Sequence, residues 1–237
     1  NDLEIMSIEE KALFLSRRNN LIKRLETVLK KKKKNEHLSK VYENIENKLI
    51  PVLAKMELEG IKVDLKYFET YKIELQEKIK KLEEEIYLLA GEKFNIGSPK
   101  QLAEILFEKL EIEPVKKTKT GYSTDVEVLE ALALREISIA EKLLEYRSYA
   151  KLLSTYVEPL PKLVDENSRI HTTFNQNGTS TGRLSSTNPN LQNIPSKTEE
   201  GMKIRKGFVS KEGYSFISFD YSQIELRVLA ELSKDEN

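Results

Sequence analysis

The apolar pattern of the chain changes at Pro161, and this change limits what the sequence can fold into. Before that residue, apolar side chains recur at the spacing of amphipathic helices. After it, short alternating runs are separated by segments rich in Asn, Ser, Thr, Gly and Pro, a pattern typical of strands and loops. The sequence therefore predicts an α+β architecture, mostly helical at first and followed by a small sheet.

Local signals place the individual elements. Ser98 and Thr124 are each followed three residues later by Gln101 or Glu127, which can close a capping box, and Gly91 lies where a helix C-cap is expected. We expect helices over 7–29, 38–59, 65–89, 98–110, from 124, over 137–156 and over 222–232. Strands are expected over 61–64, 169–174, 206–210 and 214–220.

Composition excludes several classes of protein. The 237 residues suffice for one large domain or two small ones, and 39 basic residues balance 39 acidic ones, so any binding of nucleic acid must come from local clusters of charge. The chain has no cysteine, which excludes disulfides and thiolate metal sites. No apolar run is long enough for a membrane span. A cytoplasmic protein without membrane contact is therefore expected.

Three segments after Pro161 stand out by residue type and order. They read Thr-Gly-Arg-Leu-Ser-Ser at 181–186, Pro-Asn-Leu-Gln-Asn-Ile-Pro at 189–195 and Asp-Tyr-Ser-Gln-Ile-Glu-Leu-Arg at 220–227. Together they resemble the palm motifs of the family A DNA polymerases. Segments 94–107 and 144–156 resemble the thumb of that family and the helix that returns from thumb to palm.

The resemblance implies a right-hand polymerase fold and a division of the chain. It implies the tail of an exonuclease-like domain over 1–48, the beginning of the polymerase domain at the palm base over 49–64, the thumb over 65–160, and part of an antiparallel palm sheet with motif A over 161–237. The strand before Asp220 would then need a partner from elsewhere and would present an exposed edge. The implied activity is template-directed DNA synthesis, the transfer of a nucleotidyl group from dNTP to the primer 3′-hydroxyl.

Asp220 has two interpretations. It follows an alternating run and precedes a predicted helix, and Asp in that position commonly stabilises the helix start without any ligand. The resemblance implies instead that Asp220 and the carbonyl of Tyr221 hold two Mg²⁺ ions, which serve the primer hydroxyl and the pyrophosphate leaving group.

Glu225 also has two interpretations. With Ser222 it can form a capping box, whereas the resemblance implies that it lies under the incoming sugar and excludes a 2′-hydroxyl. The catalytic residues implied by the resemblance are Asp220, Glu225 and Arg183. The implied dNTP-binding residues are Tyr221, Ser222, Gln223, Ile224 and Glu225.

Contacts to primer-template DNA are implied for thumb and palm side chains. A planar cation such as Arg183 can donate to minor-groove acceptors, and the amides of 189–195 can do so without reading sequence. Amides in turns also cap their own loops, and thumb cations can be ordinary surface charges. The implied DNA-binding residues are Arg147, Lys151, Thr118, Lys119, Thr120, Thr181, Arg183, Ser185, Asn190, Gln192 and Asn193.

Two parts of a polymerase site have no counterpart in this sequence: the fingers helix with its Arg, Lys and Tyr, and the second palm motif, His-Asp-Glu. We therefore expect no synthesis by residues 1–237 alone, and a requirement for a C-terminal polymerase fragment from a second polypeptide or a continuation of the chain. Two alternatives are a non-catalytic module that grips primer-template DNA, and a helical scaffold whose motifs are remnants. Salt-sensitive binding of primed duplex separates these two alternatives.

Overall fold

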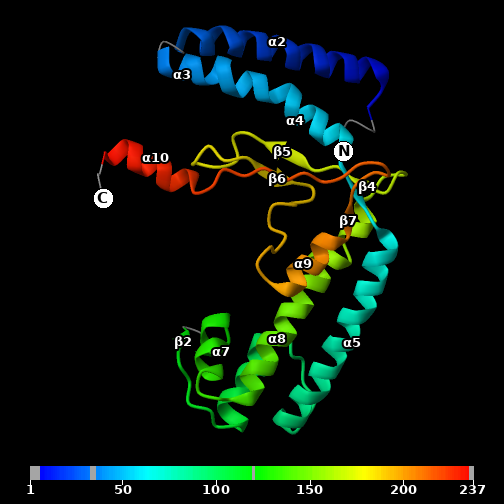
Figure 1. The fold of residues 1–237 in the computed structure, drawn as a ribbon, viewed down its shortest axis with the longest axis vertical. Helices are drawn as coiled ribbons and strands as arrows, with labels where there is room; N and C mark the ends of the chain where they lie inside the picture. The colour runs from blue at the N-terminus through cyan, green and yellow to red at the C-terminus, as the bar shows by residue number, and fades with distance from the viewer. Residues whose placement is uncertain (1–5, 33–35, 119–120, 235–237) are drawn as a thin grey trace. The chain divides into compact units, whose positions relative to one another are not determined.

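The computed structural model describes residues 6–32, 36–118 and 121–234, which belong to two compact units (Figure 1). The first unit contains Asn1–Glu59 and Phe174–Ser185, and the second contains Gly60–Thr173 and Ser186–Asn237. Helices predominate and the sheets are small, so the predicted α+β class is confirmed. None of the helices in the described ranges is long and apolar enough to cross a bilayer.

The first unit is helical, as predicted for this part of the chain. Residues 174–185 also belong to this unit, and hydrogen bonds connect them to its helices. The backbone N–H of Phe174 donates to the Glu57 carboxylate at 2.6 Å, and the Gln176 amide donates to the Glu46 carboxylate at 2.6 Å. The helices of this unit are α2 (Ile8–Lys32), α3 (Glu36–Val41), the π-helix η1 (Tyr42–Glu46) and α4 (Asn47–Glu59).

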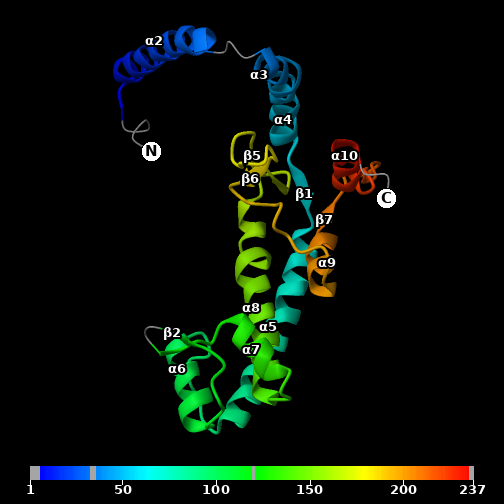
Figure 2. The same cartoon turned by 90° about the vertical axis from the view of Figure 1, so that its left-hand side faces the viewer.

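Two long helices, α5 (Leu65–Ala90) and α8 (Ser138–Leu152), lie side by side and form the frame of the second unit (Figure 2). The Asp64 carboxylate caps the start of α5 by accepting from the Tyr67 N–H at 2.9 Å. Gly91 ends the helix with a left-handed φ of 73°, which glycine adopts without strain. These local signals explain why the predicted helix over 65–89 is confirmed.

Two apolar cores lie along α5. Its C-terminal half, including Ile86, packs with leucines 102, 106, 129, 132 and 143, while its N-terminal half, including Phe68 and Leu75, packs with Leu152, Tyr156 and Ile204. Burying one such side chain contributes roughly 1.5–3 kcal/mol. The first core holds α6 (Pro99–Ala103), η2 (Glu104–Lys109), the hairpin β2 (Lys117–Thr118) and β3 (Gly121–Tyr122), and α7 (Val126–Ala133).

The predicted capping boxes at Ser98 and Thr124 differ in detail from the observed caps. Ser98 caps α6, but the Gln101 side chain accepts from the Asn95 N–H at 2.7 Å instead of closing back on Ser98. The cap of α7 is Asp125, one residue after the predicted Thr124. A carboxylate is a stronger acceptor for helix N–H groups than a hydroxyl, which explains the shift.

A three-stranded antiparallel sheet lies at the other end of α5. Its central strand pairs Ile61 with Ile170 on one side and Val63 with Phe208 on the other. The order is β4 (Arg169–Ile170), β1 (Ile61–Val63), β7 (Phe208–Val209). The remaining elements are η3 (Leu153–Val157), η4 (Leu160–Leu163), the paired strands β5 (Thr173–Asn175) and β6 (Ser185–Thr187), and α9 (Glu199–Lys206).

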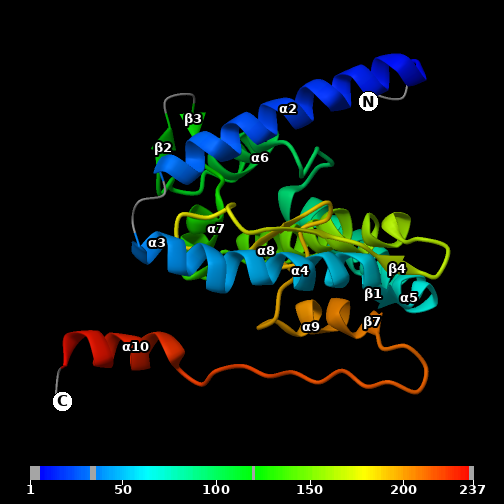
Figure 3. The same cartoon turned by 90° about the horizontal axis from the view of Figure 1, so that it is seen from above.

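The predicted strands after Pro161 are shorter than expected, and one is wrong. The strand expected over 169–174 is divided between β4 and β5, and the one over 206–210 is reduced to β7 because Lys206 still belongs to α9. Residues 214–220 form no strand; Figure 3 shows them as a long connection to α10 (Ile224–Ser233). A strand needs a neighbour for its backbone groups, and the sheet ends at β7.

Candidate functional site

Asp220 lies in the exposed connection between β7 and α10. Its neighbours are exposed as well, Phe219 to 92% and Tyr221 to 81%. Side chains this exposed do not shield a carboxylate from water. Asp220 is therefore accessible to a ligand and is not enclosed by apolar residues.

The residues after Asp220 begin α10 in a way that the sequence did not predict. The N-cap is Gln223, with a left-handed φ of 52°, and no side chain accepts a capping hydrogen bond there. The predicted capping box between Ser222 and Glu225 is therefore wrong. Instead, Nε of Arg227 donates to the carbonyl of Ser222 at 2.9 Å. Glu225 lies in the first turn of α10, where an acidic side chain is favoured by the helix dipole.

The donor chemistry at Asp220 fits a hard cation only in part. Carboxylate and carbonyl oxygens are the donors that Mg²⁺ prefers, and Asp220 and Tyr221 supply one of each. Within residues 6–32, 36–118 and 121–234, no group of three or more His, Cys, Asp or Glu side chains is placed to hold a metal ion. These two donors do not complete the octahedral coordination that Mg²⁺ requires.

Thr181, Arg183 and Ser185 lie on a tight turn of the first unit. The Thr179 hydroxyl donates to the carbonyl of Arg183 at 2.8 Å, and Gly182 adopts a left-handed φ of 78°. Thr181 and Arg183 are exposed, and Ser185 is half-buried at the start of β6. The turn therefore presents a planar cation to the solvent.

The amides of the 189–195 loop have different surroundings. Oδ1 of Asn190 accepts from the Ser186 hydroxyl at 3.2 Å and from the Gln192 N–H at 3.0 Å, so this amide caps its own loop. Ser186 is buried and accepts from the Leu191 N–H at 3.1 Å. The side chains of Gln192 and Asn193 are exposed. Asn190 thus shapes the loop, and the two amides after it face outward.

Arg147 and Lys151 lie one turn apart on α8 but differ in burial. Arg147 is half-buried, and its guanidinium donates to the carbonyl of Thr124, just before α7. Lys151 is exposed. Arg147 therefore makes a structural bond that the sequence did not predict, whereas the Lys151 side chain is exposed to solvent. The predicted contacts of Lys119, Thr120 and the Thr118 side chain lie outside the described residues.

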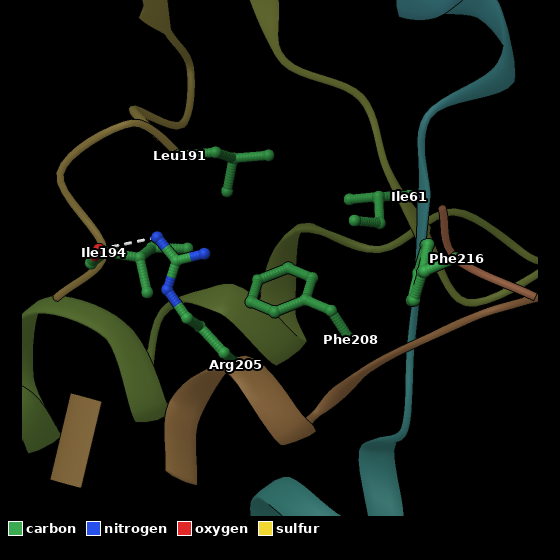
Figure 4. A pocket seen from close by; sticks show the side chains of 6 residues that line it. All are labelled: Ile61, Leu191, Ile194, Arg205, Phe208 and Phe216. Atoms are coloured by element: carbon green, nitrogen blue, oxygen red, sulfur yellow. Dashed lines mark hydrogen bonds between the residues drawn. The ribbon is translucent and has the colours of Figure 1, made fainter. Parts of the chain in front are cut away.

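A pocket of about 290 Å³ lies beside the 189–195 loop (Figure 4). Its lining contains no acid and no nucleophile, so it cannot carry acid–base or nucleophilic chemistry. The one cation, Arg205, turns toward the backbone of Ile194. The lining residues are Ile61, Leu191, Ile194, Arg205, Phe208 and Phe216.

The sequence did not single out two residues that hold this loop, Tyr156 and Arg205. Both donate from their side chains to loop carbonyls. The prolines at 189 and 195 indicate a stiff loop, but they do not reveal which side chains hold it. Tyr156 lies 37 residues from Asn193 and Arg205 lies 10 residues from Pro195, so no helix or turn spacing identifies these partners.

Comparisons with known proteins agree with the motifs. Residues 65–237 match the sequence model of DNA polymerase family A. DNA polymerase I of Caldicellulosiruptor bescii is 56% identical over 197 residues, which cover 83% of this chain and 23% of the relative. DNA polymerase I of Bacillus subtilis is 50% identical over 225 residues, which cover 94% of this chain and 26% of the relative. The chain thus spans about a quarter of the length of these relatives.

A solved structure agrees as well. It is the POL domain of Pol1 from M. smegmatis, in complex with DNA primer-template and dNTP. The match has a TM-score of 0.75 and 44% sequence identity, and it covers 83% of this chain and 35% of the solved one.

Proposed function

The chain belongs to DNA polymerase family A, and from this premise we propose that it carries part of the machinery for template-directed DNA synthesis. The observation that supports this most directly is the exposed Asp220 at the start of the segment 220–227, inside the region that matches the family. The proposed division is an exonuclease-like tail over 1–48, the palm base over 49–64, the thumb over 65–160 and a partial palm over 161–237.

In the proposed site, Asp220 and the carbonyl of Tyr221 would hold the divalent ions that family A polymerases use, with Mg²⁺ as the proposed metal. Such ions, when bound, activate the primer hydroxyl and stabilise the leaving pyrophosphate. The dNTP would lie against residues 221–225, with Glu225 excluding a 2′-hydroxyl. The described acidic groups do not complete this site, so we propose that a C-terminal polymerase fragment, or further chain, supplies the fingers and the second carboxylate motif.

Primer-template DNA is the proposed partner. Arg183 and the outward amides of Gln192 and Asn193 would donate to minor-groove acceptors, which nearly every base pair offers. Arg147 and Lys151 would meet the phosphates near the thumb, together with the residues around Thr118. The remaining proposed contacts are Thr181, Ser185, Asn190, Lys119 and Thr120. Because DNA is the proposed substrate, we also propose that the chain acts in the cytoplasm.

A primer-extension assay tests this proposal. The 237-residue chain is mixed with a fragment that contains the fingers and the second palm motif of a family A polymerase, and extension is followed with Mg²⁺. We expect extension only in the mixture, and its loss in Asp220→Asn. Asp165→Asn, which changes an acid outside the motif segments, is the control. Extension by the chain alone, or an unaffected Asp220→Asn mixture, would contradict the proposal.

A second function is favoured because the motif segments offer only one carboxylate, Asp220, to the proposed metal site. In this second function, the thumb and partial palm bind primer-template DNA without catalysing synthesis. In that case primed duplex binds with salt-sensitive affinity, but no complementing fragment restores extension. Fluorescence anisotropy with labelled duplex, combined with the extension assay, distinguishes the two functions.

A further inference from the structure

Three successive backbone carbonyls in the 189–195 loop accept hydrogen bonds from side chains of distant elements. The Tyr156 hydroxyl, in η3, donates to the carbonyl of Asn193 at 2.5 Å. Arg205, in α9, donates from Nη2 to the carbonyl of Ile194 at 3.2 Å and from Nε to that of Pro195 at 3.1 Å. Three peptide groups in a row are thereby held in orientation, and Figure 4 shows the guanidinium reaching the loop.

Packing reinforces these bonds on the same side of the loop. Ile194 is only 7% exposed and belongs to the core that contains Tyr156 and Ile204. α9 approaches the loop so closely that a Cβ atom on Gly201 would lie 2.5 Å from Cβ of Pro195 and 2.7 Å from its carbonyl oxygen. Since real Cβ contacts are longer than this, only glycine permits this approach. The inner side of the loop is therefore held by both packing and hydrogen bonds.

The helix that carries Arg205 is itself attached to α5. The Tyr71 hydroxyl donates to the Glu200 carboxylate at 2.6 Å, and the Lys203 ammonium donates to the Glu74 carboxylate at 3.0 Å. The Tyr67 hydroxyl donates to the carbonyl of Lys203 at 2.9 Å. Arg205 thus links the position of the loop to that of α5, a long helix with one buried face.

We infer that Arg205 and Tyr156 are positioning residues that set how Gln192 and Asn193 meet the minor groove of the primer-template duplex. This inference rests on the proposed function. Amide contacts to base edges depend on geometry, and a supporting shell that is loose by about 1 Å commonly weakens a site. Arginine suits the role because its planar fork can donate to two adjacent carbonyls, whereas a lysine ammonium acts as a point charge without that fork.

The first test is hydrogen exchange of the 237-residue chain without DNA. In Arg205→Gln we expect amides 191–194 to exchange about tenfold faster, because the loss of one typical hydrogen bond changes an opening equilibrium by that order. The amides of α5 should be unchanged. Arg135→Gln is the matched control, since Arg135 also donates to a backbone carbonyl, that of Glu113, in the same unit. Unchanged exchange at 191–194 in Arg205→Gln would overturn the inference.

The second test asks whether Arg205 acts through the amide of Asn193. The affinity of the chain for primed duplex is measured for wild type, Asn193→Ala, Arg205→Gln and the double variant. We expect Asn193→Ala to weaken binding by about tenfold in the wild type. In the Arg205→Gln background it should weaken binding by about threefold or less, because the effects of two residues that act together are not additive. Arg205→Lys should recover part of the loss, and Tyr156→Phe should act in the same direction as Arg205→Gln.

The outcomes separate this inference from the proposed function. If the wild-type chain binds duplex and the two substitutions are additive, Arg205 does not act through Asn193 and only the inference is wrong. If the wild-type chain does not bind duplex, the proposed DNA contact is wrong, and the role of Arg205 falls with it. Hydrogen exchange then still shows whether Arg205 holds the loop.

Discussion

The Tyr71 hydroxyl donates a 2.6 Å hydrogen bond to the Glu200 carboxylate, although the two residues are 129 positions apart in the sequence. The same carboxylate accepts from the ammonium groups of Lys78 at 2.9 Å and Lys203 at 3.5 Å. Its side chain is 17% exposed. Glu200 is therefore the centre of a shielded polar network that attaches α9 to α5.

Removing this centre should destabilise the second unit. We expect Glu200→Ala to lower the free energy of unfolding by about 1–3 kcal/mol, because Tyr71 and Lys78 lose a shared, partly buried acceptor. Urea denaturation measures the loss. The control is Lys81→Ala: Lys81 lies 3.9 Å from Glu85 with its side chain 79% exposed, and such surface pairs contribute little. Equal effects of the two substitutions would contradict the prediction.

The same network predicts a dependence of stability on pH. Burial acts to raise the pKa of Glu200, but hydrogen bonds from Tyr71 and Lys78 outweigh it, and the pKa lies below its usual 4.5. A carboxylate with a lowered folded-state pKa stabilises the protein above its unfolded-state pKa, and this contribution is lost as pH falls through the folded-state value. The stability difference between wild type and Glu200→Gln should therefore be constant at neutral pH and shrink below 4.5. A difference that grows on acidification would show that Glu200 does not act as the charged group.

Gly60 and Gly213 form a matched pair for testing close approach. Both have left-handed φ angles, 62° and 79°, so alanine adds a similar backbone strain, roughly 1–2 kcal/mol, at each. A Cβ atom on Gly60 would lie 2.6 Å from the carbonyl oxygen of Ile170, whereas one on Gly213 would have no described atom within 4 Å beyond its adjacent residues. Thermal unfolding should show a clearly larger loss of stability for Gly60→Ala than for Gly213→Ala. Equal losses of stability would show that the close approach of β4 to Gly60 does not contribute to the effect.

Arg147 and Lys151 should differ when each is replaced with alanine. Arg147→Ala should lower the free energy of unfolding by about 1–3 kcal/mol, because the carbonyl of the buried Thr124 loses its charged donor. Lys151→Ala should leave stability unchanged and weaken duplex binding, reducing the slope of log affinity against log salt by about one. Denaturation and anisotropy on the same samples check both. A stable Arg147→Ala variant would show that its bond to Thr124 is dispensable.

Glu225→Ala should change sugar selection in the complemented extension assay. If Glu225 lies under the incoming sugar, its loss opens space for a 2′-hydroxyl, and incorporation of ribonucleotides relative to deoxyribonucleotides should rise by tenfold or more, roughly the discrimination available from a steric contact. Glu231→Ala, also on α10, is the control and should select sugars as the wild type does. Unchanged selection in Glu225→Ala would exclude this role.

The predictions from local sequence were most successful where the signal and its effect lie within one turn. The bounds of α5 follow from Asp64 and Gly91, because a helix cap and a left-handed terminus involve only neighbouring residues. The capping box at Ser222 and Glu225 was wrong although its residues have the required spacing. Cap geometry also depends on how the preceding chain enters the helix, and residues 214–220 are not held in a strand.

Residue type and order are enough to establish the family, the α+β class and the segments that carry the candidate chemistry. Three features became visible only in the folded chain: Arg147 is half-buried, Tyr156 and Arg205 hold the 193–195 carbonyls, and Glu200 joins α9 to α5. These contacts join residues between 10 and 129 positions apart. Their geometry arises when two apolar cores pack along α5, and no local pattern of residues records it.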